Sequence, residues 1–150
     1  MIEFAMSAMV LTYSFSAVFQ LGYSMYLYNE LVGAVRGGAR YASLAKVSND
    51  GTTPSLQAAY TTAVQNMVVY GNTSPAAGDQ PVVPGLTTGQ VSVTVRNSPS
   101  DWAAATPKYI TVSVSGYTID AVFKTYTLTS KPSLRVPFFG EYCVANGSTC

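Results

Sequence analysis

Hydrophobic positions follow two patterns along the chain, first a continuous apolar run and later a strict alternation. From Phe4 to Asn29 the residues are mostly apolar or aromatic, without proline, and Glu3 is the only charged residue before Glu30. A helix rises about 1.5 Å per residue, and about 20 mainly apolar residues are enough to cross a bilayer. This run therefore predicts a helix of membrane-spanning length.

The run continues into an amphipathic segment that ends near residue 46. Residues at spacings of three and four carry the helical pattern onward: Leu31, Val32, Ala34, Val35, Arg36, Ala39 and Arg40. We therefore predict one helix of about 45 residues, roughly 67 Å long, with an apolar front half and an amphipathic rear half. The turn and proline in KVSNDGTTP end it, so we place a domain boundary between residues 1–46 and residues 47–150.

Residues 55–71 predict a second helix that covers a sheet. Its expected buried face consists of Leu56, Tyr60, Ala63 and Met67, with Val64 as a further candidate, and Gly71 is expected to stop it. The segment 72–89 is rich in proline and glycine, which predicts an irregular surface loop.

The alternating pattern occupies the C-terminal half. Val91, Val93 and Val95 alternate with Ser92 and Thr94, which predicts a half-buried strand over residues 90–96. Residues 109–115 alternate in the same way and should form a hairpin with it.

Two further strands complete the predicted sheet. Residues 117–129 predict a longer third strand, with a break near Asp120 as the alternative, and residues 134–139 predict a short edge strand beside two prolines. The expected fold class is α+β: a long N-terminal hydrophobic helix packed against a small antiparallel β-sheet head with one covering helix. The Ser and Thr face of the sheet would point outward or against another subunit.

Composition narrows the possible chemistry. Charged residues make up 10% of the chain, against a usual ~25%, and the net charge is +1. Without clustered Lys and Arg there is no electrostatic case for a nucleic-acid partner. The chain also has no histidine, the commonest general base and metal ligand. We therefore expect neither an enzyme nor a cofactor or metal site.

Two cysteines, Cys143 and Cys150, enclose six residues that include an Asn-Gly turn signal. In an exported chain they would form a disulfide, and this pairing is favoured over two free thiols.

Aromatic side chains crowd the predicted helix at Tyr13, Phe15, Phe19, Tyr23, Tyr26 and Tyr28. Helix packing is the favoured interpretation over an electron-conduction path, which would need continuous stacking. Residues 37–39 are expected to allow close approach of helix and sheet. Arg36 and Arg40 are interpreted as solvated charges, with a contact between subunits as the alternative.

The carboxylate of Glu3 lies at the apolar start of the long helix. An acid in a membrane-length helix is expensive unless it finds a partner, and the nearest cation in sequence is an amino terminus, its own or a neighbour's. The alternative is an N-terminal helix charge favoured by the helix dipole. The chain begins without the basic residues of a signal peptide, so we expect a leader to have been removed before Met1.

Two motifs resemble one protein family. EFAMSAMVLTYSF and NELVGAVRGGARYASL are similar to the TadE-like pilins and pseudopilins of tight-adherence systems, a type IV pilin-like family. The resemblance extends through AVQNMVVYGN, PVVPGLTTGQVSVTV, ITVSVSGYTI and KPSLRVP, and so covers nearly the whole chain. The family usually has a proline where this chain has Met9, which predicts an unbroken helix here.

The resemblance implies a structural subunit of an extracellular pilus-like filament on the cell surface. It implies leader removal by a prepilin peptidase, insertion into the inner membrane with its assembly machinery, and polymerisation with identical subunits. Met1, Glu3 and Phe4 would serve assembly, with Glu3 pairing with a neighbour's amino terminus. The alternatives are a monomeric membrane-anchored adhesin and a minor pseudopilin that primes a filament.

Overall fold

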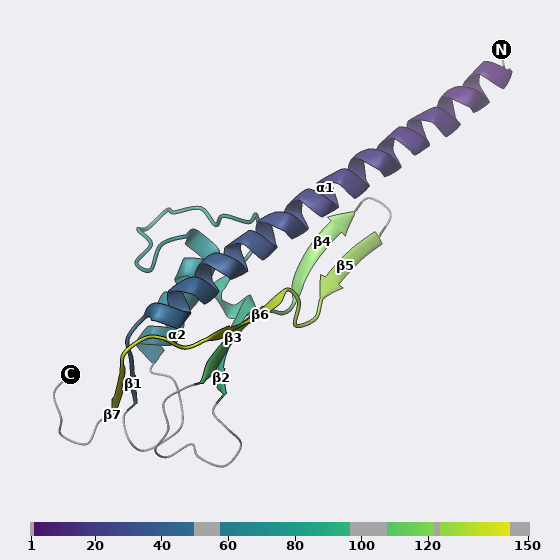
Figure 1. Ribbon diagram of the computed structural model, residues 1–150. Coiled ribbons are helices and arrows are strands. Elements are labelled where there is room, and N and C mark those ends of the chain that lie inside the picture. The colour runs from purple at the N-terminus through teal and green to yellow at the C-terminus, as the bar shows by residue number, and fades with distance from the viewer. Residues whose placement is uncertain (1, 50–57, 97–107, 122–123, 145–150) are drawn as a thin grey trace.

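The computed structural model describes residues 2–49, 58–96, 108–121 and 124–144 (Figure 1). A long helix, α1 (Ile2–Leu44), runs through the molecule, and the other described elements gather around its C-terminal half (Figure 1). These are a second helix, α2 (Ala58–Tyr70), a short 3-10 turn, η1 (Thr88–Gln90), and small sheets. The predicted α+β class is confirmed.

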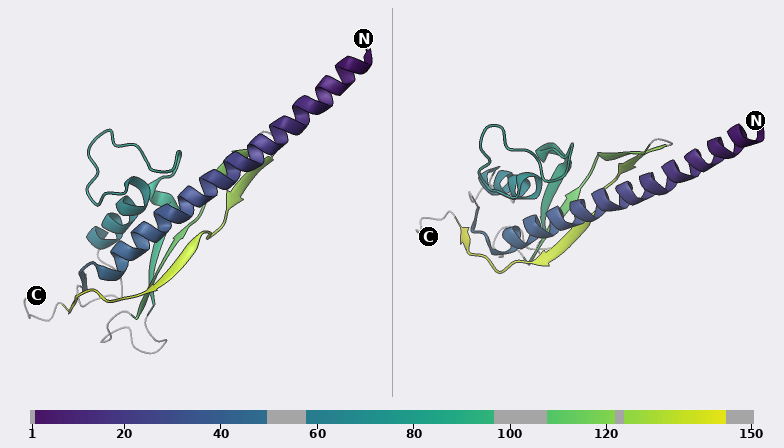
Figure 2. Two further views of the ribbon diagram at one scale, coloured as in Figure 1. Left: turned by 45° about the horizontal axis from the view of Figure 1, so that its top comes forward. Right: turned by 90° about the horizontal axis from the view of Figure 1, so that it is seen from above.

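Helix α1 is continuous, as predicted. It passes through Met9 and Gly22 without a break and ends at Leu44. Its buried residues repeat at spacings of three and four, and all belong to the second half: Leu27, Leu31, Val35, Gly38, Ala39, Ala42 and Ser43. The first half projects beyond every other described element, as both views of Figure 2 show. The helix therefore packs against the head along only its C-terminal half.

Tertiary contacts cap the C-terminal end of α1. The last four carbonyls of a helix have no partner within the helix. Here the Tyr60 hydroxyl donates to the Ala42 carbonyl oxygen at 2.6 Å, and the Phe139 N–H donates to the Ser43 carbonyl oxygen at 2.8 Å. The end of α1 is therefore held by α2 on one side and by the chain after the sheet on the other.

The main sheet contains β2 (Val91–Arg96), β3 (Tyr109–Val114) and β6 (Ser133–Pro137) in the order β2-β3-β6, all antiparallel. The predicted hairpin and edge strand are both confirmed. Burial alternates along β3, with Ile110, Val112 and Val114 fully buried. The opposite face carries exposed hydroxyl side chains such as Ser92 and Thr94.

Residues 117–129 do not form a single long strand, and the alternative of a break near Asp120 is confirmed. The chain instead forms β4 (Tyr117–Ala121) and β5 (Lys124–Leu128), which pair antiparallel as a separate hairpin. In a strand, side chains of like parity share a face, and Leu128 has the opposite parity to Ile119. One uninterrupted strand would therefore point these two residues to opposite faces, whereas a hairpin pairs the two segments directly.

A small parallel pair was not predicted. β1 (Val47–Asn49) pairs with β7 (Tyr142–Val144). Three-residue strands are too short to produce a readable alternation, and their pairing joins segments about 95 residues apart.

Helix α2 packs against both α1 and β2, so the prediction that it covers a sheet is incomplete. Its buried face is formed by Tyr60, Val64 and Val68, with Val69 beside it. Tyr60 and the further candidate Val64 are buried as predicted, whereas Ala63 and Met67 are only half-buried. Leu56 lies outside the described residues.

Gly71 ends α2 as predicted. Its φ of 69° is left-handed, and its N–H donates to the Met67 carbonyl oxygen at 3.1 Å. Glycine adopts this conformation without steric cost, which makes it the usual residue just past a helix end.

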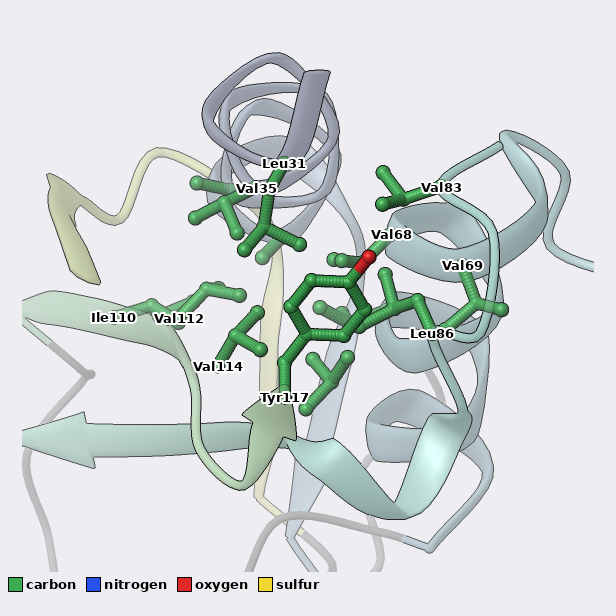
Figure 3. Close-up of a cluster of buried hydrophobic side chains, with 14 of the residues drawn as sticks. Leu31, Val35, Val68, Val69, Val83, Leu86, Ile110, Val112, Val114 and Tyr117 are labelled. Atoms are coloured by element: carbon green, nitrogen blue, oxygen red, sulfur yellow. The ribbon is translucent and has the colours of Figure 1, made fainter. Parts of the chain in front are cut away.

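The loop of residues 72–89 does not lie entirely on the surface, which corrects that prediction. Val83 and Leu86 are buried in the core beside α2 (Figure 3). The Tyr117 hydroxyl of β4 donates to the Pro84 carbonyl oxygen at 2.9 Å, and the Val82 N–H donates to the Val69 carbonyl oxygen at 2.7 Å. The loop is therefore a wall of the core, together with α1, α2 and the sheet.

Candidate functional site: the exposed half of the long helix

The first half of α1 has a large exposed apolar surface. Residues 2–26, called here the bare half, carry large side chains that are each between 49% and 81% exposed: Ile2, Phe4, Met6, Met9, Val10, Leu11, Tyr13, Phe15, Val18, Phe19, Leu21, Tyr23, Met25 and Tyr26. Soluble monomers rarely expose contiguous apolar patches above a few hundred Å². The surface therefore requires a membrane, a partner, or both in turn.

Three hydroxyl groups in the bare half are bonded within the helix itself. Ser7, Thr12 and Ser14 each donate to the carbonyl oxygen four residues earlier, at 2.8 Å. Their polar atoms are thereby satisfied without water. The bare half can enter an apolar surrounding without leaving these groups unpaired.

The length of the bare half matches a bilayer. In the part of the chain that the structure describes, α1 is the one helix long and apolar enough to cross a membrane, and none of its most apolar window is buried. Glu3 and Glu30 are separated by about 40 Å along the helix, close to the ~40–45 Å of a bilayer with its headgroups. Between these two carboxylates α1 has only uncharged residues.

The predicted packing residues Tyr13, Phe15, Phe19, Tyr23 and Tyr26 all belong to the bare half and are 49–79% exposed. None of them is part of the hydrophobic core of the head. Their packing against helices of other subunits stays a prediction.

The predicted assembly residues lie at the far end of the bare half. Glu3 and Phe4 are both exposed, and Met1 lies outside the described residues. The one ion pair recorded among the described residues joins Lys46 to Glu141 at 3.8 Å, at the other end of α1. Pairing of Glu3 with an amino terminus stays a prediction.

Two exposed glycines lie on the side of α1 that faces away from the head. A Cβ atom at Gly33 or Gly37 would meet nothing within 4 Å, and both glycines are exposed. Leu44 continues this side of the helix and is 61% exposed. Small residues four apart let two helix backbones approach closely. We call Gly33 and Gly37 the open glycine face.

Gly38 has a different role from its neighbour. A Cβ atom there would collide with the Val68 side chain of α2 and would lie 3.6 Å from the Val64 carbonyl oxygen. The close approach predicted for residues 37–39 therefore exists, but it occurs between α1 and α2 rather than between α1 and the sheet.

A cavity of about 320 Å³ opens beside α1, just below the bare half. The connection from β5 to β6 provides one wall, and α1 provides the other, including Val32, Val35 and Arg36. Arg36 was interpreted as a solvated charge; it is exposed, but it also lines this cavity. No sequence signal could have found the cavity, because its second cation, Lys131, lies 95 positions further along the chain.

The predicted disulfide cannot be placed, since Cys150 lies outside the described residues, while Cys143 belongs to β7. Within the described ranges there is no group of three or more Cys, Asp or Glu residues that could hold a metal ion.

Comparison with known proteins gives no match: no family model, curated protein or solved structure is significantly similar to this chain.

Proposed function

We propose that this chain is a structural subunit of an extracellular pilus-like filament. In the filament, the bare halves of neighbouring α1 helices pack together in the core, and the heads form the outer surface. The observation that carries this proposal is the bare half itself, a run of residues 2–26 whose large apolar side chains are exposed while the rest of the helix is built into the head.

The shape of the molecule supports this arrangement. The bare half continues the axis of α1 (Figure 1). The other half of α1 is anchored in the head by buried residues that include Leu27, and by Leu31 and Val35, which point into the core (Figure 3). Parallel bare halves can therefore bundle while the heads remain outside. The open glycine face adds a place where a neighbouring helix could approach α1 closely beside the head.

Before assembly, a membrane can cover the apolar surface of the bare half. The same apolar surface can be solvated by lipid, and lipid contacts can then be exchanged for helix contacts without exposing the bare half to water. The family resemblance adds leader removal by a prepilin peptidase and an inner-membrane assembly machinery. The proposed location is the inner membrane first and the cell surface afterwards.

A second candidate is a monomeric membrane-anchored adhesin. It is favoured by the outward face of the main sheet, where Arg135 Cζ lies 3.5 Å from the centre of the Tyr109 ring among exposed hydroxyl side chains. Such an arginine-aromatic pair can contact a ligand. A minor pseudopilin that primes a filament of another subunit is a variant of the first proposal.

Electron microscopy of material sheared from the cell surface tests the proposal, with the filament subunits identified by mass spectrometry. A photo-crosslinking residue at Phe19 should give a ladder of covalent oligomers in filaments, because Phe19 would lie in the core. The same residue at Ser92, on the outward face of β2, should give few oligomers.

The competing functions predict other results. Filaments that contain this chain only in trace amounts would indicate a priming subunit. A chain that remains in the membrane fraction, without filaments and without crosslinks from Phe19, would contradict the filament proposal and favour the anchored adhesin.

A further inference from the structure

The β4–β5 hairpin lies beside α1 at the level where the bare half joins the head (Figure 1). Residues that pair directly across two antiparallel strands point to the same face, so Ile119 of β4 and its partner Tyr126 of β5 share one face of the hairpin. Ile119 is 6% exposed and belongs to the core, whereas Tyr126 is 53% exposed. The same face of the hairpin is therefore buried on β4 and exposed on β5.

This difference arises because α1 covers β4 more fully than β5. β4 contacts α1, and β5 lies on the far side of β4 (Figure 1). At the base of the hairpin, Tyr117 of β4 is 3% exposed, and its partner Leu128 is half-buried against the core. The layer of helix on strands is therefore complete over β4 and incomplete over β5.

A second helix packed parallel to α1 on this side would pass beside β5. Packed helices lie about 8–10 Å apart, and neighbouring strands lie about 4.8 Å apart, so such a helix is within reach of a tyrosine side chain on β5. The two strands of the hairpin run along α1, which lets a parallel helix follow them (Figure 1). The bare half is a helix of this kind, because it is exposed, apolar and uncharged between Glu3 and Glu30.

Lipid is a poorer occupant of this position than a helix. Among the described residues, β5 has a strand partner on one side only. The backbone N–H and C=O groups of its other edge need water or a peptide partner, which the hydrocarbon of a bilayer does not supply. Thr125 and Thr127, on the opposite face of β5, are also exposed. β5 therefore suits the outer boundary of a helix bundle, where one face meets a helix and the rest meets water.

We propose that the bare half of a second copy of this chain packs beside α1 against the Tyr126 side of the hairpin. The proposal rests on the proposed filament and adds to it a contact between the head of one subunit and the helix of the next. Two different surfaces meet, the hairpin face of one copy and the bare half of the other. Such heterologous contacts build helical filaments when the rotation between copies does not close a ring.

The test places a photo-crosslinking phenylalanine analogue at position 126 of the full chain, assembled into filaments. Illumination should join two chains into a product of twice the monomer mass, and mass spectrometry after chymotrypsin digestion should place the attachment within residues 2–26. Position 127 is the matched control, because Thr127 is exposed on the same strand but belongs to the opposite face. We expect several times more crosslinked dimer from position 126 than from position 127.

A charge at the same two positions gives an independent measurement. Tyr126→Asp should lower the filament yield roughly tenfold, because its carboxylate would lose water against an apolar helix. Thr127→Asp should stay within about twofold of the wild-type yield, since an exposed substitution changes little. Tyr126→Phe keeps the ring and should keep the yield. A thermal melt followed by circular dichroism identifies any variant with an unfolded head, and the aromatic crosslinker at position 126 still tests the contact if Tyr126→Asp unfolds.

Three results would overturn the proposed contact while leaving the filament proposal intact. One is equal crosslinking from positions 126 and 127 in filaments. Another is attachment to the head of the second copy instead of residues 2–26. The third is attachment of a phospholipid instead of a second chain, which would make lipid the occupant. If the wild-type chain forms no filaments, the proposed function fails and the contact fails with it.

Discussion

At the scale of single residues, a missing methyl group sets the distance between α1 and α2. Gly38 leaves room for Val68, whereas Gly37, one position earlier, faces open space. Substitution of a helix glycine by alanine normally gains about 0.5–1 kcal/mol of stability through reduced backbone freedom. Alanine substitutions at these two neighbouring positions therefore separate the effect of packing on stability from the effect of helix propensity.

Gly38→Ala should destabilise the head by roughly 1–3 kcal/mol, the usual cost of forcing an extra group into a packed interior. Urea unfolding of the full chain in detergent micelles, followed by circular dichroism, measures this change. Gly37→Ala is the control and should leave stability equal or slightly higher. If the two variants prove equally stable, Gly38 is not needed for the close packing of α1 on α2.

Tyr60 provides a second prediction at this scale. Its hydroxyl is buried and donates to the Ala42 carbonyl oxygen at 2.6 Å. Burial, with a smaller contribution from nearby Tyr41, raises the pKa of Tyr60 well above its ordinary value near 10. A raised pKa in the folded state favours the protonated form, so this contribution to stability is complete below pH 10 and declines as the pH rises further.

Tyr60→Phe should therefore lose about 0.5–1.5 kcal/mol at neutral pH, the net value of one hydrogen bond. The variant should also lose less additional stability than the wild type between pH 9 and about pH 11. Urea unfolding at a series of pH values measures both effects. Parallel stability curves for the two proteins above pH 9 would contradict the role given to Tyr60.

At the scale of elements, the loop of residues 72–89 is part of the core rather than a passive connection. Val83 is fully buried, and its neighbour Val82 is 48% exposed. Val83→Ala should cost roughly 1.5–3 kcal/mol, from two lost methyl groups and the cavity they leave. Val82→Ala should stay within about 0.5 kcal/mol of the wild type, as exposed substitutions do.

Thermal unfolding of the full chain in micelles distinguishes the two valines. The lower melting temperature should be confined to Val83→Ala, while the circular dichroism spectrum at low temperature remains that of the wild type. A similar small effect in both variants would mean that the loop contributes little to the core.

The secondary structure elements could be predicted where the pattern is local. Helix α1 and the β2–β3 hairpin repeat with clear periods of about 3.6 and 2 residues, and the structure contains both. A break near Asp120 was expected as an alternative, but the pairing of β4 with β5 as a separate hairpin was not, because a run of Thr and Tyr does not show which segments pair. Val83 and Leu86 were missed because a loop has no period from which burial can be inferred.

At the scale of the whole molecule, the bare half and its single acid determine the proposed assembly. Glu3 lies at the end of α1 that is furthest from the head (Figure 1). A substitution there should leave the head unchanged and act only where molecules pack together.

Glu3→Gln and Glu3→Ala should insert into membranes and fold normally. Both should nevertheless lower the filament yield roughly tenfold or more, because removing one member of a buried ion pair costs about 3–5 kcal/mol. Glu3→Asp keeps the charge and should retain most of the yield. Filament mass per cell, measured after shearing, gives the yield, and head folding is followed by circular dichroism. A wild-type filament yield from Glu3→Ala would mean that Glu3 serves only as an N-terminal helix charge, whose interaction with the helix dipole is worth about 0.3–1 kcal/mol.

The sequence by itself determined the length and apolar character of α1, the position of Glu3 at its start, and the alternating strands of the main sheet. These properties depend on residues within a few positions of one another, so they can be predicted from the local hydrophobic periodicity. The aromatic residues and Glu3 could be named from the sequence for the same reason.

Only the tertiary structure decided where α1 becomes bare and which distant residues meet. Leu27 marks the start of burial because the head packs against the helix from there on. The pairing of β1 with β7, and the cavity that Arg36 and Lys131 both line, join segments about 95 residues apart. Such contacts arise from the packing of whole elements, so they cannot be predicted from a local hydrophobic periodicity.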